Sequence, residues 1–86
     1  MKPEEMKELR RQEVVRWLAE LGFNTEDGWE LNDVCKARFV LSHSDLPEAA
    51  SLRWRKGRVE YFEEEYNGIE QWHELKRRDQ LLPLLE

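Results

Sequence analysis

Apolar and charged residues alternate near the middle of the chain, from Leu52 to Phe62. Lys56-Gly57 is a two-residue connection whose glycine accepts positive φ, so it predicts a tight turn that pairs Arg55 with Arg58. Side chains alternate across a strand. One face therefore holds Leu52, Trp54, Val59 and Tyr61, and the other holds Arg53, Arg55, Arg58 and Glu60, with Phe62. We expect a β-hairpin with one apolar and one basic face.

The N-terminal segment has helical spacing instead. Pro3 suits a first helical position, and Glu4 and Glu5 suit the positive end of the helix dipole. Apolar residues then recur on one stripe, at Met6, Val14, Trp17, Leu18 and Leu21. Gly22 lies where a left-handed C-terminal residue belongs, and Phe23 can fold back on Leu18. The pattern predicts a helix over residues 3–21 that buries its apolar stripe on the domain's own core.

Between the helix and the hairpin, Trp29–Leu31 suggests a short extended piece. From Val34 onward, Cys35, Ala37, Phe39 and Leu41 alternate with Lys36 and Arg38. This period of two predicts a half-buried strand over residues 34–42. Leu31, Val34, Cys35 and Phe39 also fall on one helical stripe, so an all-α fold is the alternative.

The C-terminal part predicts a second helix. Asn67 with Glu70 has the spacing of a cap, Ile69, Trp72, Leu75 and Leu82 fit an inward stripe, and Pro83 ends the helix. The whole chain, residues 1–86, then forms one α+β domain with the order α-β-β-β-α, a three-stranded antiparallel sheet and both helices on one face. This order resembles that of double-stranded-RNA-binding domains, but Asn67–Gln71 lacks their basic pattern, so we assign no family.

Composition narrows the class of protein. The chain has 86 residues, 38% of them charged, a formal net charge of −5 and four Trp, three Phe and two Tyr. A chain of this length buries only a small core, and the large aromatic side chains supply enough apolar area for a folded monomer. The single Cys35 excludes an internal disulfide, and the N-terminus carries no apolar signal segment, which favours a cytoplasmic setting. No apolar run approaches the ~20 residues of a membrane helix.

Candidate catalytic residues do not assemble in this sequence. Cys35 and His43 lie about 26 Å apart if their segment is a strand, so only His73 could reach the thiol. Two histidines and one cysteine without short spacing fall below a zinc signature. Glu63-Glu64-Glu65 is a solvated charge run in the simplest interpretation. We therefore expect no enzyme activity, no cofactor and no metal.

The basic face of the predicted sheet is the strongest functional signal. Its candidate binding residues are Arg38, Arg53, Arg55, Lys56 and Arg58. Guanidinium groups donate charge-assisted hydrogen bonds to carboxylates, so we expect a non-enzymatic protein-interaction module with an acidic protein partner. A nucleic-acid-binding module that uses the same arginines is the alternative. A third interpretation is that Glu60 and Glu64 pair with these cations across strands, which leaves a merely soluble surface.

The C-terminal tail carries four leucines, Leu81, Leu82, Leu84 and Leu85. Such a tail usually docks on the core of its own domain. The alternative is a free apolar segment that makes a homo-oligomer contact.

Overall fold

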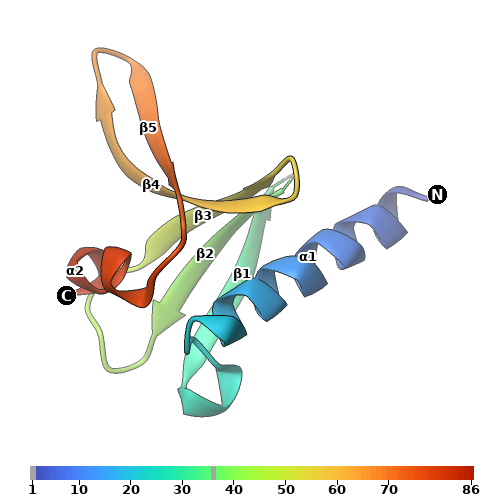
Figure 1. The fold of residues 1–86 in the computed structure, drawn as a ribbon, viewed down its shortest axis with the longest axis horizontal. Coiled ribbons are helices and arrows are strands. Elements are labelled where there is room, and N and C mark those ends of the chain that lie inside the picture. Colours follow the sequence, from blue (N-terminus) through green and yellow to red (C-terminus); the bar gives the residue numbers. More distant parts are fainter. Residues whose placement is uncertain (1, 36) are drawn as a thin grey trace.

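The computed structural model describes residues 2–35 and 37–86. Helix α1 (Pro3–Glu20) and a 3-10 turn, η1 (Thr25–Asp27), precede five strands, which are β1 (Trp29–Cys35), β2 (Arg38–His43), β3 (Ala50–Arg55), β4 (Arg58–Tyr66) and β5 (Ile69–Glu74). A second 3-10 turn, η2 (Arg78–Gln80), and the short helix α2 (Leu82–Leu85) complete the chain (Figure 1). The strands form one antiparallel sheet in chain order. The α+β class is confirmed, whereas the prediction of three strands and the all-α alternative are wrong.

Helix α1 begins and ends as predicted. Pro3 occupies its first turn beside Glu4 and Glu5. At the other end Gly22 adopts φ 93°, which a glycine reaches without steric cost. The Phe23 amide donates to the Leu18 carbonyl at 2.9 Å and the Gly22 amide donates to Ala19 at 3.0 Å. These two bonds satisfy carbonyls that the helix leaves open, so the helix stops at this point.

The central hairpin, formed by β3 and β4, has the predicted register. Arg55 pairs with Arg58, Trp54 with Val59, Arg53 with Glu60 and Leu52 with Tyr61. Lys56 and Gly57 adopt φ 52° and 77°, as a tight hairpin turn of this type requires. The hairpin prediction is therefore confirmed in its turn, its register and its two faces.

The single strand predicted over residues 34–42 is wrong. The chain turns between β1 and β2, where Ala37 adopts φ 54° and Cys35 pairs with Arg38. Lys36, which was predicted to lie in that strand, falls outside the described residues. Cys35 is exposed and not part of the core, although Phe39 and Leu41 are buried as predicted. The positive φ of an alanine gave no signal in the sequence, because left-handed turns favour glycine or asparagine.

The long C-terminal helix is also wrong. Asn67 and Gly68 adopt φ 53° and 78° and form a hairpin turn that joins β4 to β5, and the described chain after β5 holds the short 3-10 turn η2 and the four-residue α-helix α2. A register shift between Phe62 and Glu64 marks a bulge in β4. Bulges bend a strand, and beyond this one the β4–β5 hairpin projects from the body as an arm (Figure 1). The order shared with double-stranded-RNA-binding domains is thereby lost.

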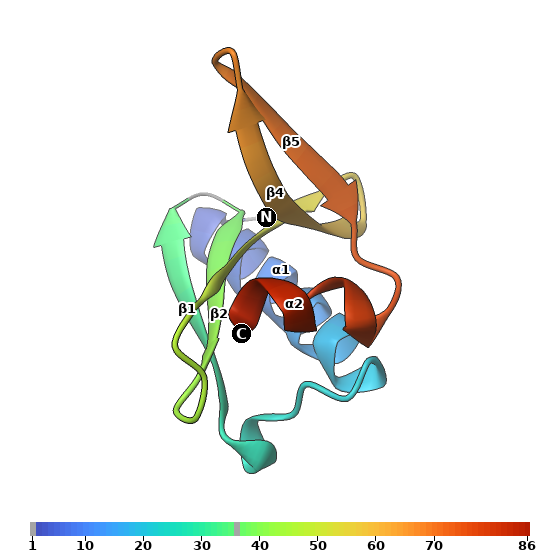
Figure 2. The same ribbon diagram turned by 90° about the vertical axis from the view of Figure 1, so that its left-hand side faces the viewer.

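The core lies between the sheet and the two helices. Figure 2 shows α1 and α2 on the same side of β1 and β2. The buried apolar residues form one cluster of Val14, Leu18, Phe23, Trp29, Leu31, Phe39, Leu41, Ala50, Leu52, Val59, Leu75, Leu81 and Leu85. The Trp17 indole donates to the Leu75 carbonyl at 2.6 Å and thus ties α1 to the end of β5. A single cluster with contributions from every layer gives the sheet one covered face.

The leucine tail docks on its own domain. Leu81 and Leu85 are fully buried, and the Glu48 amide donates to the Leu85 carbonyl at 3.3 Å. Only the half-buried Leu82 and Leu84 remain partly exposed. An oligomer contact through this tail stays a prediction, and it would rest on those two side chains.

Gly28→Ala is expected to destabilise the fold by about 2 kcal/mol, because two penalties add. Gly28 adopts φ 95°, and a β-carbon there would lie 2.9 Å from His43 Nε2. The ring cannot move away, since Nε2 lies 2.7 Å from the Asp27 carbonyl and Nδ1 accepts from the Asp45 amide at 3.0 Å. Urea unfolding at equilibrium measures the loss.

Gly57→Ala is the matched control for this clash. Gly57 also has positive φ, but no atom lies within 4 Å of the added β-carbon among the described residues. We expect a loss of only about 1 kcal/mol. Equal losses at both positions would contradict the role given to the His43 ring.

Candidate functional site

The side of the sheet turned away from the helices, here called the outer face, carries the charged residues. A row of paired positions crosses it from Arg38 in β2 to Arg53 in β3, Glu60 in β4 and Glu74 in β5. Because side chains on one face of paired strands are neighbours, the row places two cations beside two carboxylates. All five predicted binding residues lie on this face or at the β3–β4 turn that continues it.

Arg53 is held by its neighbours. Its Nε donates to Glu60 Oε1 at 2.6 Å, and each of the two side chains is 20% exposed. The guanidinium carbon also lies 4.3 Å from the centre of the Trp72 ring. A charge that has a carboxylate partner, lies against an aromatic ring and belongs to a side chain only 20% exposed presents little surface to a ligand. Arg53 therefore belongs to the structure of the outer face.

Arg38 reaches from β2 to the arm. Its Nη2 donates to Glu70 Oε1 at 3.4 Å, and its guanidinium lies 5.5 Å from the Trp72 ring centre. Trp72 in turn meets Phe62 edge-on, with ring centres 5.4 Å apart. Arg38 and Arg53 thus flank one indole, which joins the arm to the middle of the sheet. The Arg38–Glu70 pair is about half exposed, so it contributes little to stability.

The remaining three cations, Arg55, Lys56 and Arg58, form what we call the turn cluster. Arg58 pairs with Glu74 at 3.3 Å, yet its side chain stays 68% exposed. Arg55 and Lys56 are exposed, and within residues 2–35 and 37–86 no carboxylate lies within ion-pair distance of either. A shallow hollow of about 380 Å³ lies among these three side chains and Glu60. The turn cluster therefore holds two exposed cations without a carboxylate partner in the described ranges and a third that stays mostly exposed beside its partner.

Three side chains of β5 were missed as members of this face. Trp72, Glu70 and Glu74 decide which arginines are covered, whereas helical spacing had predicted Trp72 on the inner side of a helix. Asn67-Gly68 was the signal that could have found them, because Asn-Gly favours a two-residue hairpin turn. With that turn in place, Trp72 lies opposite Phe62 on the outer face.

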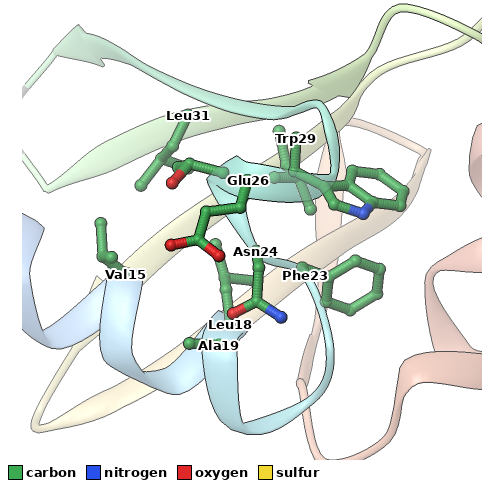
Figure 3. Close-up of a pocket in the computed structure, with 10 residues that line it drawn as sticks. Val15, Leu18, Ala19, Phe23, Asn24, Glu26, Trp29 and Leu31 are labelled. Carbon is green, nitrogen blue, oxygen red and sulfur yellow. The ribbon is translucent and has the colours of Figure 1, made fainter.

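A second hollow, between α1, η1 and β1, is shown in Figure 3. It measures about 160 Å³, and its walls include Val15, Leu18, Phe23, Trp29 and Leu31. Ligand pockets usually measure about 300–1,000 Å³, so this one admits no more than a small group. Glu26 is the single titratable residue in its lining. It offers no pair of groups for acid-base or nucleophilic chemistry.

The candidate nucleophile and bases lie apart. Cys35 is in β1 and His73 is in β5, at opposite edges of the five-stranded sheet. His73 therefore does not contact the Cys35 thiol. Both ring nitrogens of His43 already contact backbone atoms, at Asp27 and Asp45. In the part of the chain that the structure describes, no three His, Cys, Asp or Glu side chains are grouped to hold a metal ion.

The helices in the described ranges lack the combination of length and apolar content that a membrane span requires. Comparisons with known protein families, curated proteins and solved structures gave no match.

Proposed function

We propose that this chain is a non-enzymatic binding module whose turn cluster takes carboxylates from an acidic protein partner. The observation that carries the proposal is the pairing of Arg55 directly opposite Arg58 with Lys56 between them, at an exposed turn of a protein with net charge −5. Like charges directly opposite each other on neighbouring strands are destabilising. A bound anion removes that repulsion.

The outer face explains why the turn cluster and not the whole basic face is the proposed site. Where Arg38 and Arg53 oppose each other, Glu60, Glu70 and the Trp72 ring lie between or beside them. Of the three cations at the turn, Arg58 alone has a carboxylate within ion-pair distance among the described residues, and that carboxylate, Glu74, also pairs with Lys76 at 3.5 Å. Arginine forks match the planar geometry of a carboxylate, and several donors at one exposed turn can contact an acidic segment together.

Nucleic acid is the rival ligand for the same cations. Single-stranded nucleic acids bind where bases stack on open aromatic faces beside a basic groove. The aromatic residues here are Phe62 and Trp72, and Arg53 already covers Trp72 at 4.3 Å while both rings are half-buried. The arm beside them adds Glu63, Glu64 and Glu65, which repel a phosphate backbone. An acidic protein segment fits the turn cluster better.

Arg55→Glu with Lys56→Glu tests the proposal. A fluorescent oligoglutamate peptide is expected to bind the wild-type protein at low salt, and the double variant is expected to lose on the order of a hundredfold in affinity, because two donors become repulsive carboxylates. Fluorescence anisotropy measures both affinities. The same turn folds in both proteins, since neither side chain packs against the core.

Lys2→Glu with Lys7→Glu is the matched control, because it changes the net charge equally at the exposed start of α1. It should bind the peptide almost as well as wild type. Equal binding by wild type and the turn variant would remove the turn cluster as the site. Tighter binding of an oligonucleotide of the same charge, with affinity that falls steeply as salt rises, would favour the rival ligand.

A further inference from the structure

Another hollow lies between the middle of α1 and the turn end of the β3–β4 hairpin, on the helix side of the sheet. It measures about 340 Å³, at the small end of the range of ligand pockets. Two indole rings from different elements, Trp17 of α1 and Trp54 of β3, line it. Its other lining residues are Glu13, Arg16, Glu20, Gly57 and Val59. We call this feature the indole hollow.

Both indole rings are held in place by their N–H groups. Trp17 Nε1 donates to the Leu75 carbonyl at 2.6 Å, and Trp54 Nε1 donates to Glu13 Oε2 at 2.5 Å. Arg10 lies 5.6 Å from the centre of the Trp54 ring, but it is not part of the wall of the hollow. Within residues 2–35 and 37–86, no cation lies over the Trp17 ring. The hollow thus offers a fixed aromatic surface, and such surfaces attract organic cations.

The acidic residues of the hollow have no basic partner. Neither Glu13 nor Glu20 forms an ion pair in the described ranges. Glu20 is also the last residue of α1, and the last turn of this helix carries no basic residue. A carboxylate is unfavourable at the negative end of a helix dipole, whereas a cation is favourable there. A cation bound in the hollow would therefore meet two carboxylates beside an aromatic surface.

The rim of the indole hollow leads to the turn cluster. Gly57 lines the hollow and also lies in the turn between Lys56 and Arg58. Arg16, on the α1 side of the rim, is exposed and has no carboxylate within ion-pair distance in the part of the chain that the structure describes. The carboxylates and indoles of the hollow thus have cations on both sides. This arrangement is complementary to a segment in which one basic side chain is flanked by acidic ones.

We propose that the indole hollow binds an arginine side chain of the same acidic protein partner whose carboxylates contact the turn cluster. A guanidinium plane stacks on an aromatic ring and donates to a carboxylate as a fork, and a lysine ammonium offers no such fork. Glu20 is the acceptor for the fork, since Glu13 already accepts from Trp54. Arg16 and the turn cluster take the acidic residues that flank the arginine. The inference deepens the proposed function and rests on it for the acidic character of the partner.

Two peptides test this inference. One is a fluorescent Glu-Glu-Arg-Glu-Glu amide, and the other carries citrulline in place of arginine, which keeps nearly the same shape without the charge. Fluorescence anisotropy should show that wild type binds the arginine peptide about tenfold more tightly. Glu20→Gln should reduce this ratio to about twofold, because the fork loses its charged acceptor. Equal affinities of wild type for the two peptides overturn the proposal.

Glu30→Gln is the matched control for Glu20→Gln. It removes the same charge from an exposed position of β1, on the face of the sheet opposite to the hollow. The tenfold preference for arginine should persist in this variant. An equal fall of the ratio in both variants would assign the preference to net charge and contradict the indole hollow. Glu20 is exposed, so its variant is expected to fold like wild type, and far-UV circular dichroism checks this.

NMR of the indole N–H groups locates the arginine. N-acetylarginine amide serves as a probe without carboxylates, and it should shift the signals of Trp17 and Trp54 but not those of Trp29 and Trp72. No shift at Trp17 or Trp54 contradicts the indole hollow as the site. A probe that binds as tightly as the arginine peptide would assign the hollow to a free small cation and overturn its link to an acidic partner.

The two proposals fail separately. Arg55→Glu with Lys56→Glu should weaken both peptides and leave their affinity ratio unchanged, because neither side chain lines the hollow. A wild-type chain that binds oligoglutamate but does not prefer the arginine peptide contradicts the indole hollow alone. A chain that does not bind oligoglutamate, yet shifts its Trp17 and Trp54 signals with the arginine probe, contradicts the turn cluster alone.

Discussion

Leu52→Ala is expected to lower the free energy of unfolding by about 3 kcal/mol. Leu52 is 0% exposed and lies in β3 between Phe39 of β2 and Tyr61 of β4, at the centre of the sheet. Both neighbours are fixed by strand pairing, so the site cannot collapse around the lost side chain. In a domain of this size the midpoint of thermal unfolding should fall by roughly 15 °C.

Val34→Ala is the control for Leu52→Ala. Val34 lies in β1, but its side chain faces solvent and is 62% exposed. We expect a change within about 0.5 kcal/mol. Urea unfolding of both variants against wild type makes the comparison. Similar losses at the two positions would contradict the placement of the core on the helix side of the sheet.

Glu60→Ala is expected to destabilise the protein by about 2 kcal/mol. Its Oε1 accepts from Arg53 Nε at 2.6 Å, and both side chains are mostly covered. Without Glu60, the arginine charge stays beneath the Trp72 ring with no carboxylate beside it. Removing one partner of a covered pair leaves the other charge desolvated and unpaired.

A double-mutant cycle isolates this interaction. Arg53→Met keeps much of the arginine stem while removing its charge, and the cycle of Arg53→Met with Glu60→Ala should give a coupling free energy of about 1–2 kcal/mol. The Lys7–Asp33 pair, at 3.9 Å and with the lysine 67% exposed, is the comparison and should give almost none. A coupling near zero for Arg53 and Glu60 would show that this pair does not organise the outer face.

The central hairpin could be predicted in detail because all of its determinants are local. Lys56-Gly57 fixes the turn, and the period of two on either side fixes which residues face the core. Helix α1 could be predicted equally well, because Pro3 and Gly22 mark its ends and its apolar residues recur at helical spacing. Both elements bury one face and expose the other. Such elements show a regular spacing of apolar and polar residues, from which the structure can be predicted.

The arm could not be recognised from apolar spacing, because neither of its faces packs against the core. Ile69 and His73 are exposed on one face of β5, and Trp72 on the other face is covered by Arg38, Arg53 and Phe62 instead of by the core. The residues Ile69, Trp72 and Leu75 fit a helical stripe by coincidence. The Asn67-Gly68 turn signal was outweighed by the interpretation of Asn67 as a helix cap.

The charged face was located correctly by strand parity, but its chemistry was not. Parity places Arg38, Arg53, Arg55 and Arg58 on one side whichever strands follow. Their partners Glu70 and Glu74 come from β5, a strand that the apolar pattern did not predict. Whether a cation is neutralised thus depends on pairing between distant segments. Of the two partners expected from the sequence, Glu60 pairs with Arg53, whereas Glu64 lies opposite Gln71 in β5.

The division of the arginines into covered and open ones is tested most directly by NMR of their Nε–Hε groups during titration with oligoglutamate peptide. Arg55 and Arg58 signals should shift and saturate together, while the Arg53 signal, held by Glu60 and Trp72, should stay in place. A larger shift at Arg53 than at Arg55, or no shift at any of the three, would contradict the turn cluster as the binding site.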